Sequence, residues 1–315
     1  MQNEIIYRLI LLAVRLMAHI PYRLGQFKGK VLGLLAYMIP MSRKEVALEN
    51  IRKSFQTISE SKAKNLLRRV YMHFGSMLFE TPHIMKFTAE NLFRYVTFEG
   101  VEDFDRAIAR GKGVFILTAH FGNWELMAAA VTILWGGTAV VARPADFLPL
   151  DRVISHLRSR HGAKIIPKQR AMRQIMEAIK INQIVGILLD QNVDWYEGVF
   201  VPFLGRWACT NKGLALIALR TETPVIPAFP VKQKDGRYRI ILEKEIKLQR
   251  TGDKTADVDA NTELFTRVIE KYVKKYPDHW FWWHKRWKTK NSCPLPLQRS
   301  RGYGPVSRRT DEVRG

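Results

Sequence analysis

The strongest constraint on the fold of this chain is the alternation of short apolar runs with helical patterns through its middle. Short apolar runs lie at residues 113–118, 138–142, 163–166, 184–189 and 225–229. Between them, helical periodicity covers residues 126–134, 151–160, 171–181 and 212–220. Because strands that alternate with helices form parallel sheets covered on both faces, the sequence predicts an α/β fold with a mainly parallel central sheet flanked by helices. A further run at 237–242, after the turn signal at 234–236, predicts an edge strand.

The first forty residues pose the question of a membrane segment. Residues 5–20 are mostly apolar but include Arg8 and Arg15, whereas a spanning helix needs about 20 residues largely free of charge. At about 100° per residue, the side chains of Glu4, Arg8, Arg15 and His19 fall within a sector of about 60°. This polar stripe favours an amphipathic or membrane-anchoring helix at the bilayer interface over a tilted span or an ordinary core helix.

The domain organisation follows from these patterns. We expect a membrane-associating segment at residues 1–41, an α/β domain at 42–290, and a basic, disordered tail at 291–315. A long helix is predicted at 61–86, where apolar residues recur every three or four positions.

Charge and cysteine content restrict the function. The chain has 51 Lys and Arg against 29 Asp and Glu, a net charge of +22, which predicts an anionic partner: nucleic acid, an acidic membrane surface or an acidic protein. The two cysteines, Cys209 and Cys293, are far apart, which excludes a disulfide scaffold and a cysteine-rich zinc site. Neither H-E-x-x-H nor G-x-S-x-G occurs in the sequence, so we predict no metal ion, no bound cofactor and no covalent enzyme intermediate.

One segment concentrates the residues suited to catalysis, His120-Phe-Gly-Asn-Trp-Glu125, directly after the apolar run 113–118. In an open parallel sheet, residues after the carboxyl ends of strands line the ligand crevice. A histidine beside a carboxylate forms a minimal general base. A five-residue gap would separate the two side chains by about 140° on a regular helix, so we expect His120 in the turn and Glu125 in the first helical turn. A histidine that only caps the helix or lies buried is the alternative.

This segment resembles the H-x4-D/E motif of the bacterial lipid A biosynthesis acyltransferases, within the lysophospholipid acyltransferase superfamily. Three further segments agree in order along the chain. They are Val141-Ala-Arg143-Pro144; Leu189-Asp190-Gln191 with the stretch from Gly198 to Gly205 and Thr210; and the block from Tyr276 to Lys288. The resemblance extends from the N-terminus to about Lys288.

The resemblance implies an enzyme that transfers a fatty acyl chain from acyl carrier protein to a hydroxyl of a phosphorylated glycolipid, a lipid A precursor, at the cytoplasmic face of the anionic inner membrane. His120 would act as the base and Glu125 would orient it. The oxyanion or the substrate would be bound by residues drawn from Gly122, Asn123, Arg143, Asp190, Gln191 and Arg286. No nucleic acid partner is expected.

Alternative interpretations remain for the supporting residues. Arg143 could be an ordinary surface arginine, and Asp190 and Gln191 could hold neighbouring turns. The tryptophan-rich block at 280–287 could stack on bases, lie at a membrane interface or pack in the core. Two alternative functions follow, an acyltransferase for another lipid hydroxyl, such as a lysophospholipid or amino-acid lipid, and a non-enzymatic binder of nucleic acid or membranes.

Overall fold

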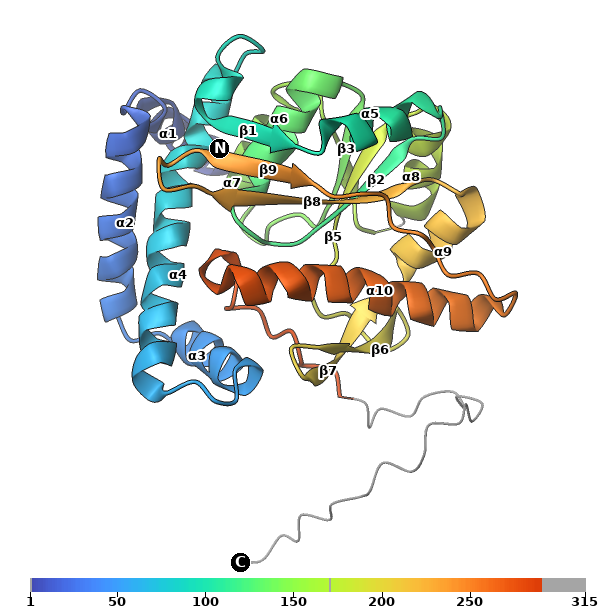
Figure 1. Cartoon of the computed structure of the whole chain (residues 1–315). Helices are drawn as coiled ribbons and strands as arrows, with labels where there is room; N and C mark the ends of the chain where they lie inside the picture. The colour runs from blue at the N-terminus through green and yellow to red at the C-terminus, as the bar shows by residue number, and fades with distance from the viewer. Residues whose placement is uncertain (1, 170, 291–315) are drawn as a thin grey trace, which may run out of the picture.

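The computed structural model of this chain describes residues 2–169 and 171–290, so the tail predicted at 291–315 lies outside the described part. Its centre is a seven-stranded sheet with the strand order β1-β9-β8-β2-β5-β3-β4 (Figure 1). The strands are β1 (Val96–Glu99), β2 (Val114–Thr118), β3 (Thr138–Ala142), β4 (Lys164–Pro167), β5 (Ile184–Leu188), β8 (Val225–Lys232) and β9 (Tyr238–Leu242). Every neighbouring pair in this sheet is parallel except β8 with β9. The predicted α/β fold with a mainly parallel sheet is therefore confirmed.

The position of β9 differs from the prediction. The sequence predicted an edge strand at 237–242, but β9 lies between β8 and β1, and β1 forms that edge of the sheet. The turn before β9 correctly indicates the antiparallel pairing with β8. The pairing with β1 joins segments more than 130 residues apart, which a local pattern does not reveal.

Helices cover both faces of the sheet. They are α3 (Ser42–Ser54), α4 (Glu60–Glu80), α5 (Val101–Ala109), α6 (Trp124–Trp135), α7 (Leu148–Ser159), α8 (Ala171–Lys180), α9 (Gly213–Thr221) and α10 (Lys254–Lys275). The long helix predicted at 61–86 is α-helical only to Glu80 and continues as the 3-10 helix η1 (Thr81–Lys86), because Pro82 cannot supply a backbone N–H to an α-helix. Strands β6 (Gly198–Phe203) and β7 (Arg206–Asn211) form a separate antiparallel hairpin.

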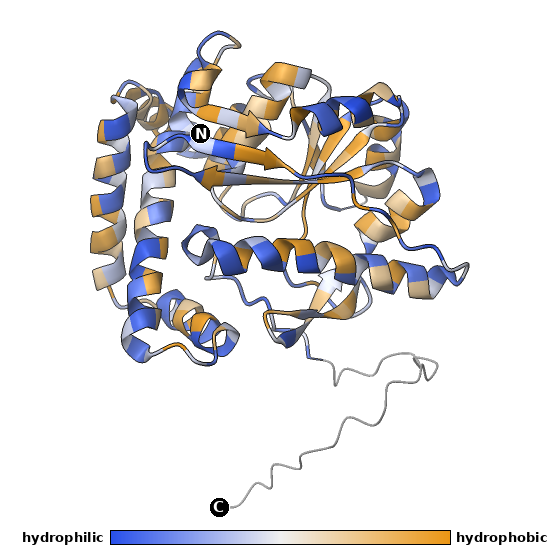
Figure 2. Ribbon diagram, viewed as in Figure 1, coloured by the Kyte–Doolittle hydropathy of each residue, from blue (hydrophilic) through white to orange (hydrophobic). Residues whose placement is uncertain are grey.

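Strand β2 shows how the two faces are filled, because all five of its residues are buried. Val114 and Ile116 belong to a core that includes residues of α5 and α6. Phe115 and Leu117 point to the other face, where the core includes residues of α8, α9 and α10. The central strands are accordingly hydrophobic along their length in Figure 2. Because β2 is held by packing on both faces, its carboxyl end is fixed in position, and so is the start of the turn that follows it.

Two helices precede this domain, α1 (Gln2–Met17) and α2 (Tyr22–Met38). Helix α2 packs along α4 at very short range, because a Cβ atom on Gly29 would overlap the backbone of Gly75. Helix α1 packs against α7 through a small cluster that includes Leu11 and Leu157. Within the described residues, none of the helices is both long enough and apolar enough to cross a bilayer.

Candidate active site

The turn between β2 and α6 presents His120 at the carboxyl end of the sheet. Gly122 has a φ of 56°, a left-handed conformation that favours glycine, and a Cβ atom there would overlap the carbonyl oxygen of Pro230. Asn123 then caps α6 by accepting a hydrogen bond from the Leu126 N–H at 3.0 Å. The backbone requirements of this short segment therefore determine where the imidazole points.

Asp190, which follows β5, holds the imidazole. Its Oδ1 lies 2.8 Å from His120 Nδ1, and its Oδ2 accepts hydrogen bonds from the His120 backbone N–H at 3.1 Å and from Trp280 Nε1 at 2.7 Å. An ionised carboxylate only accepts hydrogen bonds, so Nδ1 carries the ring proton and Nε2 keeps its lone pair. Asp190 is 3% exposed, whereas 23% of the His120 side chain is exposed.

The ionisation of Asp190 fits this arrangement. Burial alone would raise the pKa of Asp190, but the charge of a protonated His120 and the hydrogen bonds from His120 and Trp280 outweigh it and lower the pKa to about 2. The carboxylate therefore stays ionised at neutral pH, where it fixes the histidine tautomer and stabilises the imidazolium that forms on proton transfer.

Glu125 has a different partner from the one predicted. The sequence predicted that Glu125 orients His120, but its carboxylate accepts hydrogen bonds from Arg158 Nε at 2.9 Å, Arg158 Nη2 at 2.5 Å and Trp124 Nε1 at 3.0 Å. Burial would lower the pKa of Arg158, but the bonds and charge of Glu125 outweigh it and raise that pKa. The motif residue thus orients an arginine, and Asp190 takes the place beside the histidine.

Gln191 lies beside the imidazole ring of His120. Its Nε2 is 3.2 Å from His120 Nε2 and 3.4 Å from Nδ1. Because Nδ1 already donates to Asp190, Nε2 is the ring nitrogen that can accept a hydrogen bond from the Gln191 amide N–H. The Gln191 side chain is exposed, so a substrate hydroxyl can displace it and take the same position.

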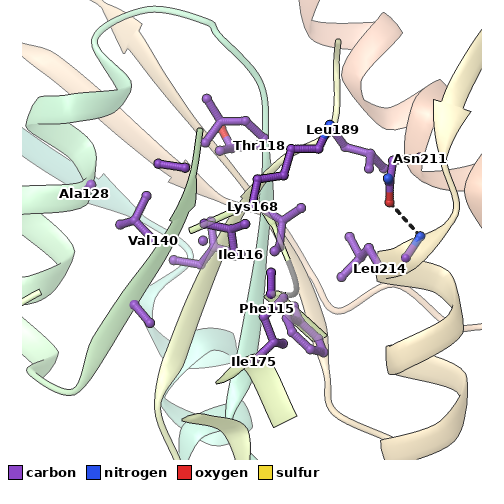
Figure 3. A pocket seen from close by; sticks show the side chains of 18 of the residues that line it. Phe115, Ile116, Thr118, Ala128, Val140, Lys168, Ile175, Leu189, Asn211 and Leu214 are labelled. Carbon is purple, nitrogen blue, oxygen red and sulfur yellow. Dashed lines mark hydrogen bonds between the residues drawn. The ribbon is translucent and has the colours of Figure 1, made fainter. Parts of the chain in front are cut away.

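His120 lines an apolar cleft of about 580 Å³. Figure 3 shows part of the lining of this cleft. Strand β3 pairs with β5 only from Thr138 to Val140, whereas its pairing with β4 continues to Ala142. The residues of β3 and β5 that come after their shared pairing line the cleft. The apolar walls come from the sheet and from α6, α8 and α9, and they include Ile116, Ala128, Val131, Val140, Ile175, Leu214 and Ile217. The charged and polar residues of the lining that are at least partly exposed mark the mouth of the cleft, and they include His120, Glu125, Arg143, Arg158, Lys168 and Gln191. Such a cleft suits a flexible hydrocarbon chain whose reactive end stays near the histidine.

A second buried carboxylate, Glu80 of α4, holds the other end of the same turn. It accepts hydrogen bonds from Gln26 at 2.9 Å, Ser76 at 2.8 Å, Tyr238 at 2.8 Å and Asn123 at 3.3 Å, and it pairs with Lys232. Glu80 is fully buried. The donors come from α2, α4, β8, β9 and the start of α6, so this cluster, the Glu80 network, joins the N-terminal helices to the sheet and to the turn that carries His120.

Comparison with known proteins adds a family to this geometry. The sequence model of the family described as bacterial lipid A biosynthesis acyltransferase matches residues 1–289. The chain belongs to this family. Family membership supports an acyltransferase, and the histidine at the mouth of an apolar cleft agrees with that class of enzyme.

Three relatives are similar to this chain along most of its length. A lipid A biosynthesis lauroyltransferase of Escherichia coli (strain K12) is 24% identical over 277 residues, which cover 87% of this chain and 89% of the relative. A lipid A biosynthesis palmitoleoyltransferase of the same strain is 23% identical over 87% of this chain and 88% of its own length. A lipid A biosynthesis acyltransferase of Haemophilus influenzae is 22% identical over 85% and 82%.

The structure changes the interpretation of three predicted binding residues. Arg286 is fully buried and donates to the carbonyl oxygens of Cys209 at 2.7 Å and Gln191 at 3.2 Å, so it cannot reach a substrate phosphate. The Gly122 N–H donates to the carbonyl of His279 at 2.8 Å and is not free for an oxyanion. Asp190 is buried and contacts the His120 imidazole, so it is not placed to bind a substrate.

Two other predicted residues have distinct positions. Arg143 lines the mouth of the cleft with a side chain that is 74% exposed, and it pairs with the exposed Asp146 at 2.7 Å. Asn123 is fully buried, and its side chain is used by Leu126 and Glu80. Arg143 is therefore placed to meet a ligand, whereas the Asn123 side chain is structural. The backbone N–H of Asn123, the group predicted to meet an oxyanion, stays a prediction.

Sequence reasoning missed Trp280 and Arg158. Trp280 lies in the tryptophan-rich block that the sequence analysis singled out, and it is fully buried with its Nε1 on Asp190. A buried indole N–H needs a hydrogen-bond acceptor. This requirement is the one sequence signal that could have linked Trp280 to a carboxylate such as Asp190. Arg158 carries no local signal, because its pairing with Glu125 spans 33 residues and depends on how α7 packs beside α6.

Proposed function

We propose that this protein transfers a fatty acyl chain from the thioester of acyl carrier protein to a free hydroxyl of a phosphorylated lipid A precursor. The observation that carries the proposal is the His120 imidazole, held by Asp190 with its Nε2 lone pair at the mouth of the apolar cleft. Membership in the lipid A biosynthesis acyltransferase family supports the acceptor class. The names of the relatives add lauroyl and palmitoleoyl chains as transferred groups in those proteins.

In the proposed reaction His120 moves one proton twice. Its Nε2 takes the proton of the acceptor hydroxyl as the oxygen attacks the thioester carbonyl carbon, which gives a tetrahedral oxyanion and an imidazolium. Collapse of this intermediate breaks the carbon–sulfur bond, and the imidazolium returns the proton to the leaving sulfur. General-base catalysis of this kind contributes roughly 10²–10⁴-fold in rate. No bond to the enzyme forms in this sequence.

Arg158 is our candidate for stabilising the oxyanion, in place of the Gly122 amide. Among the described residues, Glu125 is the acceptor for its Nε and Nη2, which uses two of the five N–H groups of a guanidinium. The remaining donors are free to face the cleft that Arg158 lines. A charged donor fixed in place before the reaction stabilises developing negative charge more effectively than solvent does. Arg143, at the same mouth, is the second candidate.

The charge of the chain suits both proposed partners. A net charge of +22 attracts an acidic carrier protein and a phosphorylated sugar, and it raises the rate at which such partners meet the enzyme. A nucleic-acid binder would share the charge but has no use for a histidine and carboxylate at the mouth of an apolar cleft.

The N-terminal helices support a location at the cytoplasmic face of the inner membrane. On α1, Leu9, Leu12 and Leu16 are 60%, 53% and 63% exposed, and together with Ile5 they form one stripe at helical spacing. On α2, Phe27 and Leu35 are also exposed. An apolar stripe that faces solvent on a basic protein is typical of a helix that lies in an anionic membrane surface. Residues 1–41 would then be the membrane-associating segment of the protein.

Acyl transfer itself is the test of the proposed function. Purified full-length protein is incubated with acyl-carrier-protein thioester and a phosphorylated lipid A precursor, and mass spectrometry follows the addition of one acyl mass. We expect product with the wild type and almost none with the His120→Ala variant. Product only with a lysophospholipid or amino-acid lipid would replace the acceptor. If no lipid is acylated and oligonucleotides bind tightly at high salt, the enzyme proposal is wrong.

Flotation with lipid vesicles tests the membrane proposal. The wild type should float with vesicles that contain anionic phosphatidylglycerol and less with neutral vesicles. A Leu9→Glu/Leu16→Glu variant should stay at the bottom of the gradient. The control is Ile181→Glu, which also places a charge on an exposed apolar site, 70% exposed, but directly after α8, a helix that lies far from α1 in Figure 1. Equal flotation of all three proteins would contradict the proposed location.

A further inference from the structure

A second, polar pocket opens beside the apolar cleft. It has a volume of about 300 Å³ and is lined by Lys168, Asp194, Glu197, His284, Lys285 and Lys288 among others. Lys168 and Glu197 also line the apolar cleft, so the two hollows adjoin each other. Figure 3 shows the extended side chain of Lys168 at the apolar cleft. A ligand in the cleft can therefore place a polar group in the second pocket without leaving His120.

The pocket is built from two segments that are fastened together. Thr289 Oγ1 accepts a hydrogen bond from the Asn192 side chain at 2.9 Å and donates to the Val193 carbonyl at 2.9 Å. The buried guanidinium of Arg286 holds the Gln191 carbonyl at 3.2 Å. These contacts fix the segment that carries Lys285 and Lys288 against the segment that follows Asp190, so the pocket exists before a ligand arrives.

Its charge favours an anion. Three ammonium groups face two carboxylates, and one of these, Glu197, already pairs with Lys168 at 3.6 Å. Among the described residues, Lys285 and Lys288 have no carboxylate within ion-pair distance. Burial lowers the pKa of His284 to about 4, so its ring is neutral at pH 7 and neither adds to nor opposes this charge. The buried Arg286 adds positive potential beneath the pocket without touching a ligand.

We propose that this pocket binds a phosphoryl group of a substrate, with Lys285 and Lys288 as its ligands and Lys168 at the entrance. The proposal rests on the proposed function, which brings two phosphoryl groups to this mouth: one on the sugar of the acceptor and one in the prosthetic arm of the carrier protein. Lysine binds phosphate as a compact, mobile charge. A phosphoryl group fixed here orients the rest of that substrate toward His120 and replaces the role predicted for Arg286.

Four substrates separate the two sources. The acceptor is used with and without its phosphate, and the donor is used as the carrier-protein thioester and as a short acyl thioester that lacks the phosphoryl group. For Lys285→Gln/Lys288→Gln in the full-length protein, we expect KM to rise about tenfold for the partner whose phosphoryl group occupies the pocket, with kcat nearly unchanged. For the phosphate-free form of that partner, KM should not change.

Lys234→Gln/Lys254→Gln serves as the matched control, because it removes the same charge from two exposed lysines outside both hollows. A KM that rises equally in both double variants, or in neither, would overturn the phosphoryl site. Binding of inorganic phosphate, measured by calorimetry, gives a readout that does not depend on acyl transfer. We expect it to weaken at least tenfold in the Lys285/Lys288 variant only. Unchanged phosphate binding would overturn the site, whereas loss of transfer in the wild type would overturn only the proposed function.

Discussion

Asp190 and Glu80 are both buried carboxylates, and both hold the turn at residues 119–123, yet their surroundings differ. Asp190 binds a histidine whose ring is 23% exposed and lines the apolar cleft. Glu80 pairs with Lys232, whose side chain is 11% exposed, and is surrounded by donors from the scaffold. Burial lowers the pKa of Lys232, but the charge and hydrogen bond of Glu80 oppose that effect.

The two buried carboxylates differ in what their charge can affect. Glu80 is fully buried, and its hydrogen-bond donors belong to the scaffold, so its ion pair can affect only the stability of the fold. The partner of Asp190 faces a cleft, so the same kind of pair can act on a ligand. Removing Glu80 should therefore change stability, and removing the histidine should change the reaction.

The largest expected effect is on the reaction itself. His120→Ala should lower the rate of acyl transfer by roughly 10²–10⁴-fold, which corresponds to about 3–5 kcal/mol, because the base is lost. Circular dichroism and the unfolding midpoint should stay close to those of the wild type, since the ring is partly exposed. A variant that transfers acyl chains at the wild-type rate would remove His120 from the mechanism.

Glu80→Ala should give the opposite pattern. Removal of one member of a buried ion pair typically costs about 3–5 kcal/mol of folding free energy, and here four further donors lose their acceptor as well. Denaturant unfolding measures this loss, and kcat per folded molecule should change little. Glu177→Ala, which breaks an exposed pair with Arg173 at 2.8 Å, is the control and should leave the midpoint nearly unchanged. Loss of kcat with normal stability would make Glu80 part of the active site.

Asp190→Asn should reduce transfer less than His120→Ala does. The base remains, but its imidazolium loses a buried charge partner, so we expect a loss of roughly 10–10²-fold, in line with the 1.5–3 kcal/mol of a hydrogen bond to a charged group. Steady-state rates of the purified wild type and variant measure this loss. A rate for Asp190→Asn equal to that of the wild type would leave Glu125, the residue predicted from sequence, as the alternative partner of the base.

The smallest expected effect is on stability at acid pH. The pKa of Asp190 is lowered from 3.8 to about 2, so the ionised carboxylate stabilises the fold at pH values above 3.8, and this stabilisation is lost as the pH falls toward 2. The shift corresponds to about 2 kcal/mol. The difference in unfolding free energy between the wild type and Asp190→Asn should shrink as the pH falls from 4 toward 2. A constant difference down to pH 2 would contradict the lowered pKa.

Much of the fold could be predicted from the sequence because its signals are local. The strands at 138–142 and 184–188 and the helix of α8 appear as predicted within one residue, since burial on both faces and helical periodicity mark them directly. The place of β9 inside the sheet could not be predicted, because its pairing with β1 depends on distant residues. The hairpin of β6 and β7 was not recognised as strands, since its apolar stretch also suits a channel wall or core.

In the candidate site, too, the contacts between residues far apart in the sequence could not be predicted. His120 and Asp190 were both singled out as strand-end residues, but nothing local joins side chains 70 residues apart. Glu125 attracted the orienting role because it is close in sequence, while the strand order places β5 directly beside β2. The pairing of neighbouring parallel strands, and not the spacing within the motif, decides which carboxylate meets the histidine.

The most direct measurement is the ¹⁵N and ¹H NMR spectrum of the His120 ring in the full-length protein. We expect the neutral form of the ring to carry its proton on Nδ1, with a downfield proton resonance from the hydrogen bond to Asp190. This resonance should disappear in Asp190→Asn and persist in Glu125→Gln. A ring protonated on Nε2, or a downfield resonance that depends on Glu125 and not on Asp190, would contradict the central claim that Asp190 prepares His120 as the base.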